Sequence, residues 1–209
     1  MRKNNYDRLA PFYDFVSRLV YGQALVRAQR SVLRFMEDEH KILIVGGGTG
    51  WVLEEIEQLG RKNISVTYLE ASSKMVALAR KRKVSFPVEF ICAYAEDTAL
   101  ARQWDVLMTP FFFDNFQEEK CLSILYNLGK CLKIKGLLLY VDFRLTRQNA
   151  KFWKKALVKT MYFFFKTVTR IETNELVDMA SVLRRQYQEE WSQSSFHDFV
   201  FAAAYRKNG

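Results

Sequence analysis

The stretch "ILIVGGGTGW", residues 42–51, decides the fold of this chain. Its first four residues are apolar, and the next six include four of the nine glycines of the whole sequence. A short apolar, β-branched run that ends in glycine is typical of a buried strand. Residues 51–60 then show helical spacing and end on a glycine, a common stop signal for a helix. Glycines at such a junction allow positive φ and close approach of a ligand, whereas a flexible linker would not stand between two such elements.

Strand-like and helix-like segments alternate along residues 41–143. We expect strands at 41–46, 64–70, 88–93, 104–109 and 136–143, and helices at 12–39, 51–60, 72–83 and 117–132. This alternation predicts a parallel sheet with helices on both faces. Residues 182–193 and 196–207 are predicted as two strands with a short polar connection, which pair antiparallel. The expected fold is therefore α/β, with a Rossmann-like seven-stranded sheet of five parallel strands and a C-terminal antiparallel hairpin.

The composition is that of a globular protein and argues against membrane spans and metal sites. Of the 209 residues, 49% are hydrophobic, which suits one domain with a full-sized core. We expect a helical cap at 1–39, a ligand-binding core at 40–143, and a basic helix with the hairpin at 144–209. The longest apolar runs are far shorter than the roughly 20 residues that cross a bilayer, and no secretory signal is visible, so we expect a cytoplasmic protein. The three cysteines lack metal-ligand spacing and the two histidines lie far apart, so we predict no metal site.

Glu70 points to a nucleoside as the ligand. It ends the second predicted strand, twenty residues after Gly50, where a carboxylate can accept hydrogen bonds from both ribose hydroxyls. The alternative is an exposed charge at a strand end. The glycine spacing does not fit the dinucleotide fingerprint, because Trp51 or Leu53 would occupy the position of its last glycine. An oxidoreductase that binds NAD or FAD is therefore the less favoured alternative.

Taken in order, six segments resemble class I S-adenosylmethionine-dependent methyltransferases, most closely the branch of the ubiquinone/menaquinone C-methyltransferases. The resemblance covers nearly the whole chain. The segments are "YDRLAPFYDFVSRLVYG" (6–22), "ILIVGGGTG" (42–50), "VTYLEAS" (66–72), "AYAED" (93–97), "WDVLMTPFFFDNF" (104–116) and "LKIKGLLLYVDF" (132–143).

This resemblance implies a methyltransferase that uses S-adenosyl-L-methionine and releases S-adenosyl-L-homocysteine. The glycines would leave room for the methionine part, Glu70 would bind ribose, and Glu96 or Asp97 would hydrogen-bond the adenine amine. The full set of cofactor-binding residues that the resemblance implies is Tyr6, Tyr13, Gly46, Gly47, Gly48, Gly50, Glu70, Ala71, Met75, Ala95, Glu96, Asp97, Thr109 and Pro110.

The chain also departs from the family. Tyr94 stands where many relatives carry an aspartate, and Asp114 with Asn115 stands where relatives often have a histidine pair. These departures keep open a non-catalytic nucleoside-binding module. The sequence "TPFF" at 109–112 replaces the Asn-Pro-Pro-Tyr type of signature that methylation of a base amine would suggest, so a nucleic-acid substrate is not expected.

Methyl transfer from a sulfonium is an in-line displacement, so the protein mainly positions the acceptor and, where needed, removes its proton. Candidate catalytic residues are Asp114 and Asp142 as bases and Tyr13 as a polar positioning group. The alternative for Asp142 is a structural carboxylate that caps a helix. The phenylalanines at 111–113 suggest a small apolar or aromatic acceptor, and the alternative is that they belong to the core.

A basic segment follows the fifth predicted strand. Residues 144–170 contain eight basic residues and no acidic one. As a helix, this segment places Lys151, Lys155, Lys159 and Lys166 on one side, with bulky apolar residues elsewhere. Peripheral contact with an anionic membrane is one reading, nucleic-acid binding another, and an ordinary solvated amphipathic helix the third.

Overall fold

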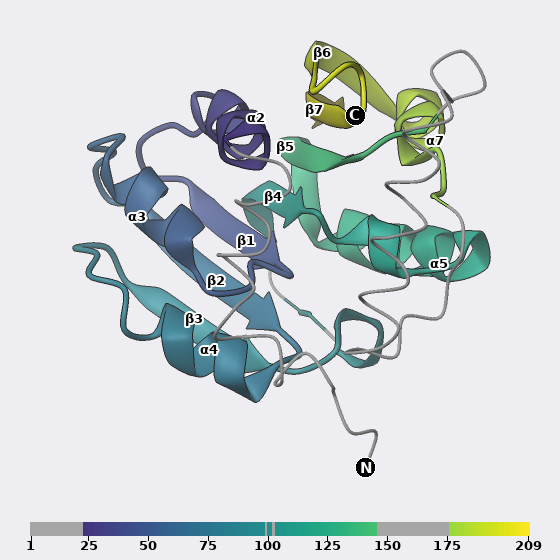
Figure 1. Cartoon of the computed structure of the whole chain (residues 1–209). Coiled ribbons are helices and arrows are strands. Elements are labelled where there is room, and N and C mark those ends of the chain that lie inside the picture. The colour runs from purple at the N-terminus through teal and green to yellow at the C-terminus, as the bar shows by residue number, and fades with distance from the viewer. Residues whose placement is uncertain (1–22, 99, 102, 146–175) are drawn as a thin grey trace.

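The computed structural model describes residues 23–98, 100–101, 103–145 and 176–209 (Figure 1). These residues form one sheet of seven strands in the order β3-β2-β1-β4-β5-β7-β6. The strands are β1 (Lys41–Val45), β2 (Ser65–Glu70), β3 (Val88–Cys92), β4 (Trp104–Pro110), β5 (Leu132–Phe143), β6 (Tyr187–Ser195) and β7 (Val200–Lys207). Strands β1 to β5 pair in parallel, and β7 runs antiparallel to both β5 and β6. The predicted α/β fold is confirmed, with its five parallel strands and its C-terminal hairpin.

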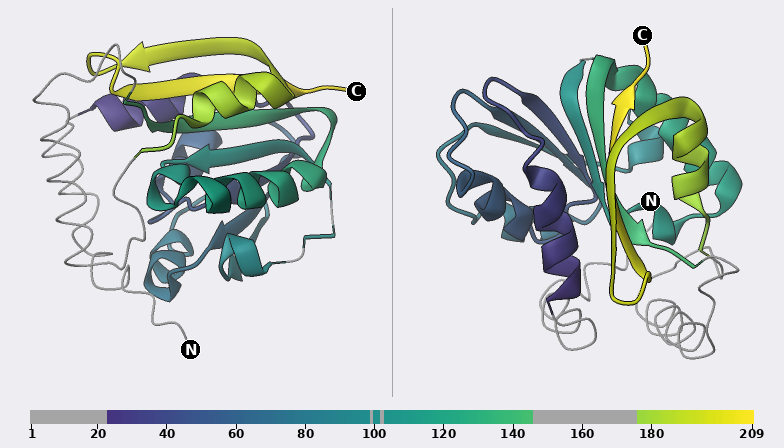
Figure 2. Two further views of the ribbon diagram at one scale, coloured as in Figure 1. Left: turned by 90° about the vertical axis from the view of Figure 1, so that its right-hand side faces the viewer. Right: turned by 90° about the horizontal axis from the view of Figure 1, so that it is seen from above.

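Helices cover both faces of the sheet, as Figure 2 shows. They are α2 (Ala24–Leu33), α3 (Trp51–Glu57), α4 (Ser73–Ala79), α5 (Glu118–Cys131) and α7 (Met179–Gln186). Helices α2, α3 and α4 share one hydrophobic cluster with the sheet, and α5 and α7 share the other. The two clusters take alternate residues of each strand: Ile42 and Ile44 belong to the first, and Leu43 and Val45 to the second. Strand β1 is therefore buried on both faces, as its continuous apolar run predicted.

One predicted element is wrong over part of its length. The strand expected at 182–193 begins only at Tyr187, because residues 179–186 form helix α7. Asp178 caps this helix by accepting a hydrogen bond from the backbone N–H of Ser181 at 3.3 Å. Helix α2 ends at Leu33, before the end of the helix expected at 12–39, and residues 12–22 of that expected helix lie outside the described residues. The single-domain expectation for 1–209 stays a prediction for the same reason.

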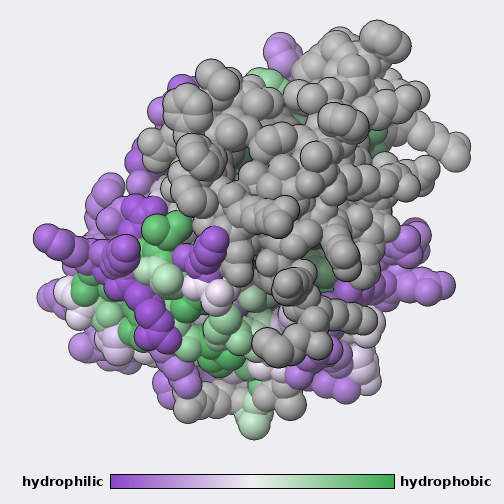
Figure 3. Space-filling view, turned by 60° about the horizontal axis from the view of Figure 1, so that its bottom comes forward, coloured by the Kyte–Doolittle hydropathy of each residue, from purple (hydrophilic) through white to green (hydrophobic). Residues whose placement is uncertain are grey.

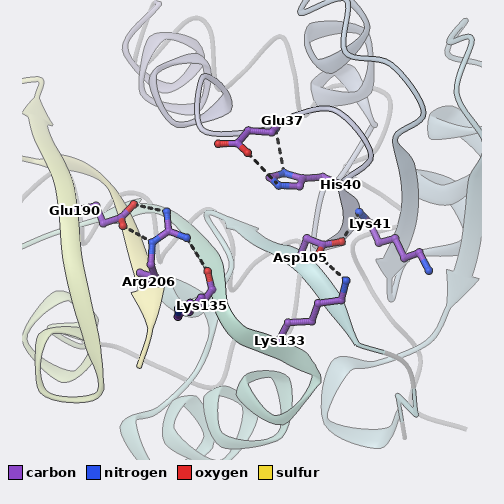
Figure 4. A network of polar contacts seen from close by, with 8 residues as sticks. All are labelled: Glu37, His40, Lys41, Asp105, Lys133, Lys135, Glu190 and Arg206. Carbon is purple, nitrogen blue, oxygen red and sulfur yellow. Dashed lines mark hydrogen bonds and ion pairs between the residues drawn. The ribbon is translucent and has the colours of Figure 1, made fainter. Parts of the chain in front are cut away.

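Because β1 to β5 are parallel, their amino ends lie on one edge of the sheet and their carboxyl ends on the other. Charged pairs close the amino end (Figure 4). Asp105, at the start of β4, accepts hydrogen bonds from the Lys133 ammonium at 2.6 Å and from the backbone N–H of Lys41 at 2.9 Å. Arg206 pairs with Glu190 and donates to the Lys135 carbonyl at 2.7 Å. The carboxyl end is different in character, and every predicted site residue that the structure describes belongs to it.

Candidate functional site

The glycine turn after β1 is packed against the protein at three of its four glycines. A Cβ atom added to Gly47 would lie 2.4 Å from the Tyr68 hydroxyl, and one added to Gly50 would lie 2.6 Å from the Ala79 Cβ. A Cβ added to Gly46 would meet the Phe112 ring at 2.7 Å. At Gly48, whose φ is +64°, an added Cβ would meet none of the described residues within 4 Å. Of the four glycines, Gly48 is therefore the one that the described part of the chain leaves open.

Two side chains from β2 hold the peptide groups of Gly48. The Tyr68 hydroxyl donates to the Gly48 carbonyl at 3.0 Å, and the Gly48 N–H donates to Glu70 Oε2 at 3.1 Å. The other oxygen of Glu70 accepts from the N–H of Ser72 at 2.8 Å. Each carboxylate oxygen has more than one lone pair, so a single hydrogen bond does not exhaust it. The glycine turn and the acid at the end of β2 thus meet, as the spacing predicted.

The segment after β3 forms a short 3₁₀ turn at Ala95–Asp97. The Glu96 carboxylate is paired with the Lys120 ammonium at 2.8 Å, which ties this turn to helix α5. Ala95 and Met75 are both buried. The end of β3 and the start of α4 therefore lie at the same edge as Glu70, where the resemblance places the adenine.

The loop after β4 is strained and capped. Phe111 has φ of +50°, a conformation that costs an ordinary residue about 1–2 kcal/mol. Asp142, at the end of β5 and 1% exposed, accepts from the N–H of Phe113 at 3.0 Å and from its neighbour Phe143 at 2.8 Å. This is the structural cap that was the alternative for Asp142, here on a 3₁₀ turn at Phe113–Asn115. A role for Asp142 as a base stays a prediction.

Asp114 lies in this turn beside Asp142. The Asn115 amide donates to Asp114 Oδ1 at 2.6 Å and to the Phe112 carbonyl at 3.0 Å. Removal from water and, second, the negative charge of Asp142 raise the pKa of Asp114 well above its usual range. Burial also raises the pKa of Asp142, to about 7, against the opposing effect of its backbone hydrogen bonds. Two carboxyl groups that resist ionisation together are a pattern found at functional sites.

Three further groups show that water is excluded around Asp114 and Asp142. Burial, and then the charges of Asp142 and Asp114, raise the pKa of the Cys121 thiol to about 12. The same causes raise the pKa of Tyr140 well above its usual range. Thr109 is 0% exposed, and its hydroxyl has no hydrogen-bond partner within the described part of the chain.

The phenylalanines after β4 divide between core and surface. Phe112 and Phe113 are buried in the cluster under α5, as the alternative for them stated. Phe111 points to the other side and is only partly buried. It begins a row of aromatic rings, with centroids 5.0 Å apart from Phe111 to Phe143 and 5.1 Å apart from Phe143 to Phe199. The row ends at Phe196, 6.5 Å from Phe199, in the β6–β7 connection.

The carboxyl edge thus gathers most of the predicted residues. Tyr6 and Tyr13 lie outside the described residues, as do residues 146–170 of the basic segment. Tyr68 was not predicted as a site residue; its place two residues before Glu70 on β2 was the available signal. The predicted residues that the structure places on this edge are Gly46, Gly47, Gly48, Gly50, Glu70, Ala71, Met75, Ala95, Glu96, Asp97, Thr109, Pro110, Asp114 and Asp142.

Two surface features complete the description. On the face that comes forward in Figure 3, hydrophobic groups of the described residues surface among hydrophilic ones. Cys92 is exposed at the end of β3, in register with Glu70 of the neighbouring strand, whereas Cys121 and Cys131 are buried.

Among the described residues, no group of three or more His, Cys, Asp or Glu side chains could hold a metal, and no helix has the length and apolarity to span a membrane.

Known proteins share this arrangement. Residues 42–136 match a family model described as a methyltransferase domain. The chain is 29% identical over 140 residues to the demethylmenaquinone methyltransferase of Thermotoga maritima, covering 66% of this chain and 59% of that protein. It is 27% identical over 141 residues to the malonyl-[acyl-carrier protein] O-methyltransferase of Priestia megaterium, covering 68% of this chain and 50% of the relative. It therefore spans about half to three fifths of these relatives.

A solved structure extends the likeness to the full chain. The match is a chain from the complex between the Haloferax volcanii Trm112 methyltransferase activator and a methyltransferase, with a TM-score of 0.72 over 100% of both chains and 12% identity. At that identity the likeness concerns the fold.

Proposed function

Since this chain carries a methyltransferase domain with the fold of the class I S-adenosylmethionine-dependent enzymes, we propose that it transfers a methyl group from S-adenosylmethionine to a small apolar or aromatic acceptor. The observation that carries the proposal is the glycine turn. Its one glycine with open space, Gly48, lies directly beside the Glu70 carboxylate at the carboxyl edge of the sheet.

The residues at this edge fit the cofactor. A side chain at Gly48 would fill the space beside the turn, and the Glu70 carboxylate next to it has the chemistry to accept hydrogen bonds from ribose hydroxyls. The turn Ala95–Asp97 and the start of α4 would hold the adenine. When bound, S-adenosylmethionine supplies an activated methyl group and a good leaving group.

The chain's own residues supply position and proton handling. Asp142 fixes the turn Phe113–Asn115 through its backbone hydrogen bonds, and this turn presents Asp114. We assign Asp114 as the base that removes a proton from the molecule that receives the methyl group. A raised pKa strengthens Asp114 as a base only in its ionised form, so the assignment rests on its place in this turn.

Phe111, which is partly buried, supports an apolar or planar acceptor, because it follows the end of β4, next to the expected methyl donor. Phe143 and Phe199 behind it belong to the core and hold the Phe111 ring in place. Aromatic side chains of this kind bind planar and apolar groups through large contact areas.

Calorimetric titration with S-adenosylhomocysteine, with NAD as the control ligand, tests the proposal. We expect a Kd on the order of micromolar for the first ligand and no heat for the second. Binding of NAD alone would instead favour the oxidoreductase alternative. No binding of either ligand would contradict the proposed function.

A further inference from the structure

Arg82 reaches the glycine turn from outside it. The residue lies three positions after the end of α4, and its guanidinium donates to the Thr49 carbonyl at 3.1 Å through Nε. Nη2 lies 3.4 Å from the Thr49 hydroxyl, and Nη1 donates to the Glu54 carboxylate of α3 at 3.0 Å. One planar group therefore contacts the turn twice and the following helix once.

Side chains from two different parts of the chain thus hold the peptide groups at the centre of the turn. Tyr68 and Glu70, from β2, hold Gly48, and Arg82 holds Thr49. Thr49 is 4% exposed. Thr49 lies between strand β1 and helix α3, and the backbone hydrogen bond that spans it, from the Gly50 N–H to the Gly47 carbonyl, is long at 3.4 Å. The side-chain hydrogen bonds therefore add to the constraint on this turn.

We propose that Arg82 is a positioning residue that keeps the glycine turn in its donor-binding shape before the donor binds. The inference rests on the proposed function. A turn that is already ordered loses less conformational entropy on binding, so the donor binds more tightly. The flat fork of arginine is required, because lysine offers one point charge and cannot reach the Thr49 carbonyl, the Thr49 hydroxyl and Glu54 together.

The test compares Arg82→Gln with Arg80→Gln. Arg80 lies at the same end of α4, and among the described residues its guanidinium stacks on the Phe90 ring, with its centre 4.8 Å from the ring centroid, rather than on the turn. Hydrogen–deuterium exchange of the unliganded protein is measured for the peptide that covers residues 46–54. We expect exchange to be about threefold faster in Arg82→Gln and unchanged in Arg80→Gln, because local opening becomes easier. The Kd for S-adenosylhomocysteine should rise about tenfold in the first variant only.

Two more variants sharpen the result. Arg82→Lys keeps the charge and should still exchange faster than the wild type. Tyr68→Phe removes only the hydroxyl that holds the Gly48 carbonyl, so it should act in the same direction with a smaller effect. Tyr68→Phe also serves if Arg82→Gln does not fold.

A lower melting temperature in Arg82→Gln with unchanged exchange at 46–54 would overturn the inference and leave Arg82 a merely structural residue. Restoration of wild-type exchange by lysine would also overturn it, since charge alone would then suffice. If the wild type fails to bind S-adenosylhomocysteine, the proposed function falls, while the exchange comparison still decides the role of Arg82.

Discussion

The pKa of an aspartate side chain is shifted in opposite directions at the two ends of the parallel strands. Asp105, at the amino end of β4, is partly buried, which by itself raises its pKa, but the hydrogen bonds from Lys133 and Lys41 outweigh burial and lower the pKa. Asp114 follows the carboxyl end of the same strand, and there burial and Asp142 raise the pKa of its side chain. Asp105 at the amino end has a lysine as its partner, whereas Asp114 at the carboxyl end lies beside a second carboxyl group, although Glu96 at that same end is paired with Lys120.

The paired Asp105 at the amino end stabilises the fold. The two adjacent carboxyl groups at the carboxyl end destabilise it. Left-handed non-glycine residues occur at both ends, for example Phe111 at the carboxyl end and Lys135 at the amino end, but the buried Thr109 hydroxyl without a partner in the described part lies at the carboxyl end. Unfavourable electrostatics persist where binding or chemistry requires them. The predictions below test whether the two ends differ in this way.

The largest effect is expected for Gly50→Ala. Its φ is +77°, and the new Cβ would lie 2.7 Å from the backbone Cα of Ala79. Left-handed strain and overpacking together should cost about 3 kcal/mol of unfolding free energy. Urea denaturation measures the loss, and S-adenosylhomocysteine binding should disappear with it. A variant with wild-type stability would show that α4 can move away from the turn.

A smaller and more selective effect is expected for Gly48→Ala, matched with Gly60→Ala. Both glycines have nearly the same φ, +64° and +65°, and open space around an added Cβ, but Gly60 lies before β2, at the amino end. Each variant should therefore lose about 1 kcal/mol of stability. Only Gly48→Ala should weaken S-adenosylhomocysteine binding, by calorimetry. If both variants bind S-adenosylhomocysteine with equal affinity, the ligand does not lie against Gly48.

The two aspartates should respond to substitution with opposite signs. At pH 8, Asp114→Asn should raise the melting temperature, because it removes a carboxyl group whose ionisation the fold opposes. Asp105→Asn should lower stability by about 1 kcal/mol, because it removes a favourable ion pair and weakens a hydrogen bond. Asp114→Asn should also lose turnover once an acceptor is known, if Asp114 takes the proton.

The pH dependence follows from the direction of each pKa shift. A raised pKa in the folded state costs stability above the ordinary value of about 3.9, so the gain in Asp114→Asn should vanish near pH 4. For Asp142, whose folded pKa is about 7, the cost develops between about pH 4 and pH 7. Asp105 has a lowered pKa, so its contribution is present above the ordinary value and is lost as pH falls through the folded pKa. Thermal melts from pH 4 to pH 8 measure this. If Asp114→Asn and Asp105→Asn change the melting temperature in the same direction, the comparison of the two ends is contradicted.

The smallest effect is expected at the amino end. Lys133→Met breaks the 2.6 Å pair with Asp105 in a setting where 41% of the lysine side chain is exposed. Exposed pairs contribute about 0.5 kcal/mol, so stability should fall by no more than this and ligand affinity should not change. A fall in S-adenosylhomocysteine affinity would show that the two ends are coupled through the sheet.

The sequence predicted most of the sheet because each parallel strand is a local apolar run. The run at 42–45 and its glycines predict a strand and a turn, and the resemblance, drawn from six segments in order, agrees with the match of residues 42–136 to the methyltransferase domain model. Helix α7 was missed because its helical spacing, Met179, Ala180 and Leu183, lies next to a strand of similar composition. The Asp178–Ser181 cap was the local signal for it.

Only those site residues that lie within a short local motif could be predicted from the sequence. Glu70 and the glycines lie within two motifs of fixed spacing. The approach of Asp114 to Asp142 joins residues 28 positions apart, and Arg82 meets Thr49 across 33 positions. No local pattern encodes such contacts, because they depend on how the strands pair and how the loops fold back over their ends.

The three thiols have a practical consequence for labelling. Burial raises the pKa of Cys121 to about 12 and also raises the pKa of Cys131, so both resist alkylation at neutral pH. Cys92 is the exposed thiol, and it stands in register with Glu70. A maleimide fluorophore should therefore attach at this one position in the unaltered chain, beside the expected ribose. Its emission would report occupancy of the site in real time, without an acceptor and without an engineered cysteine.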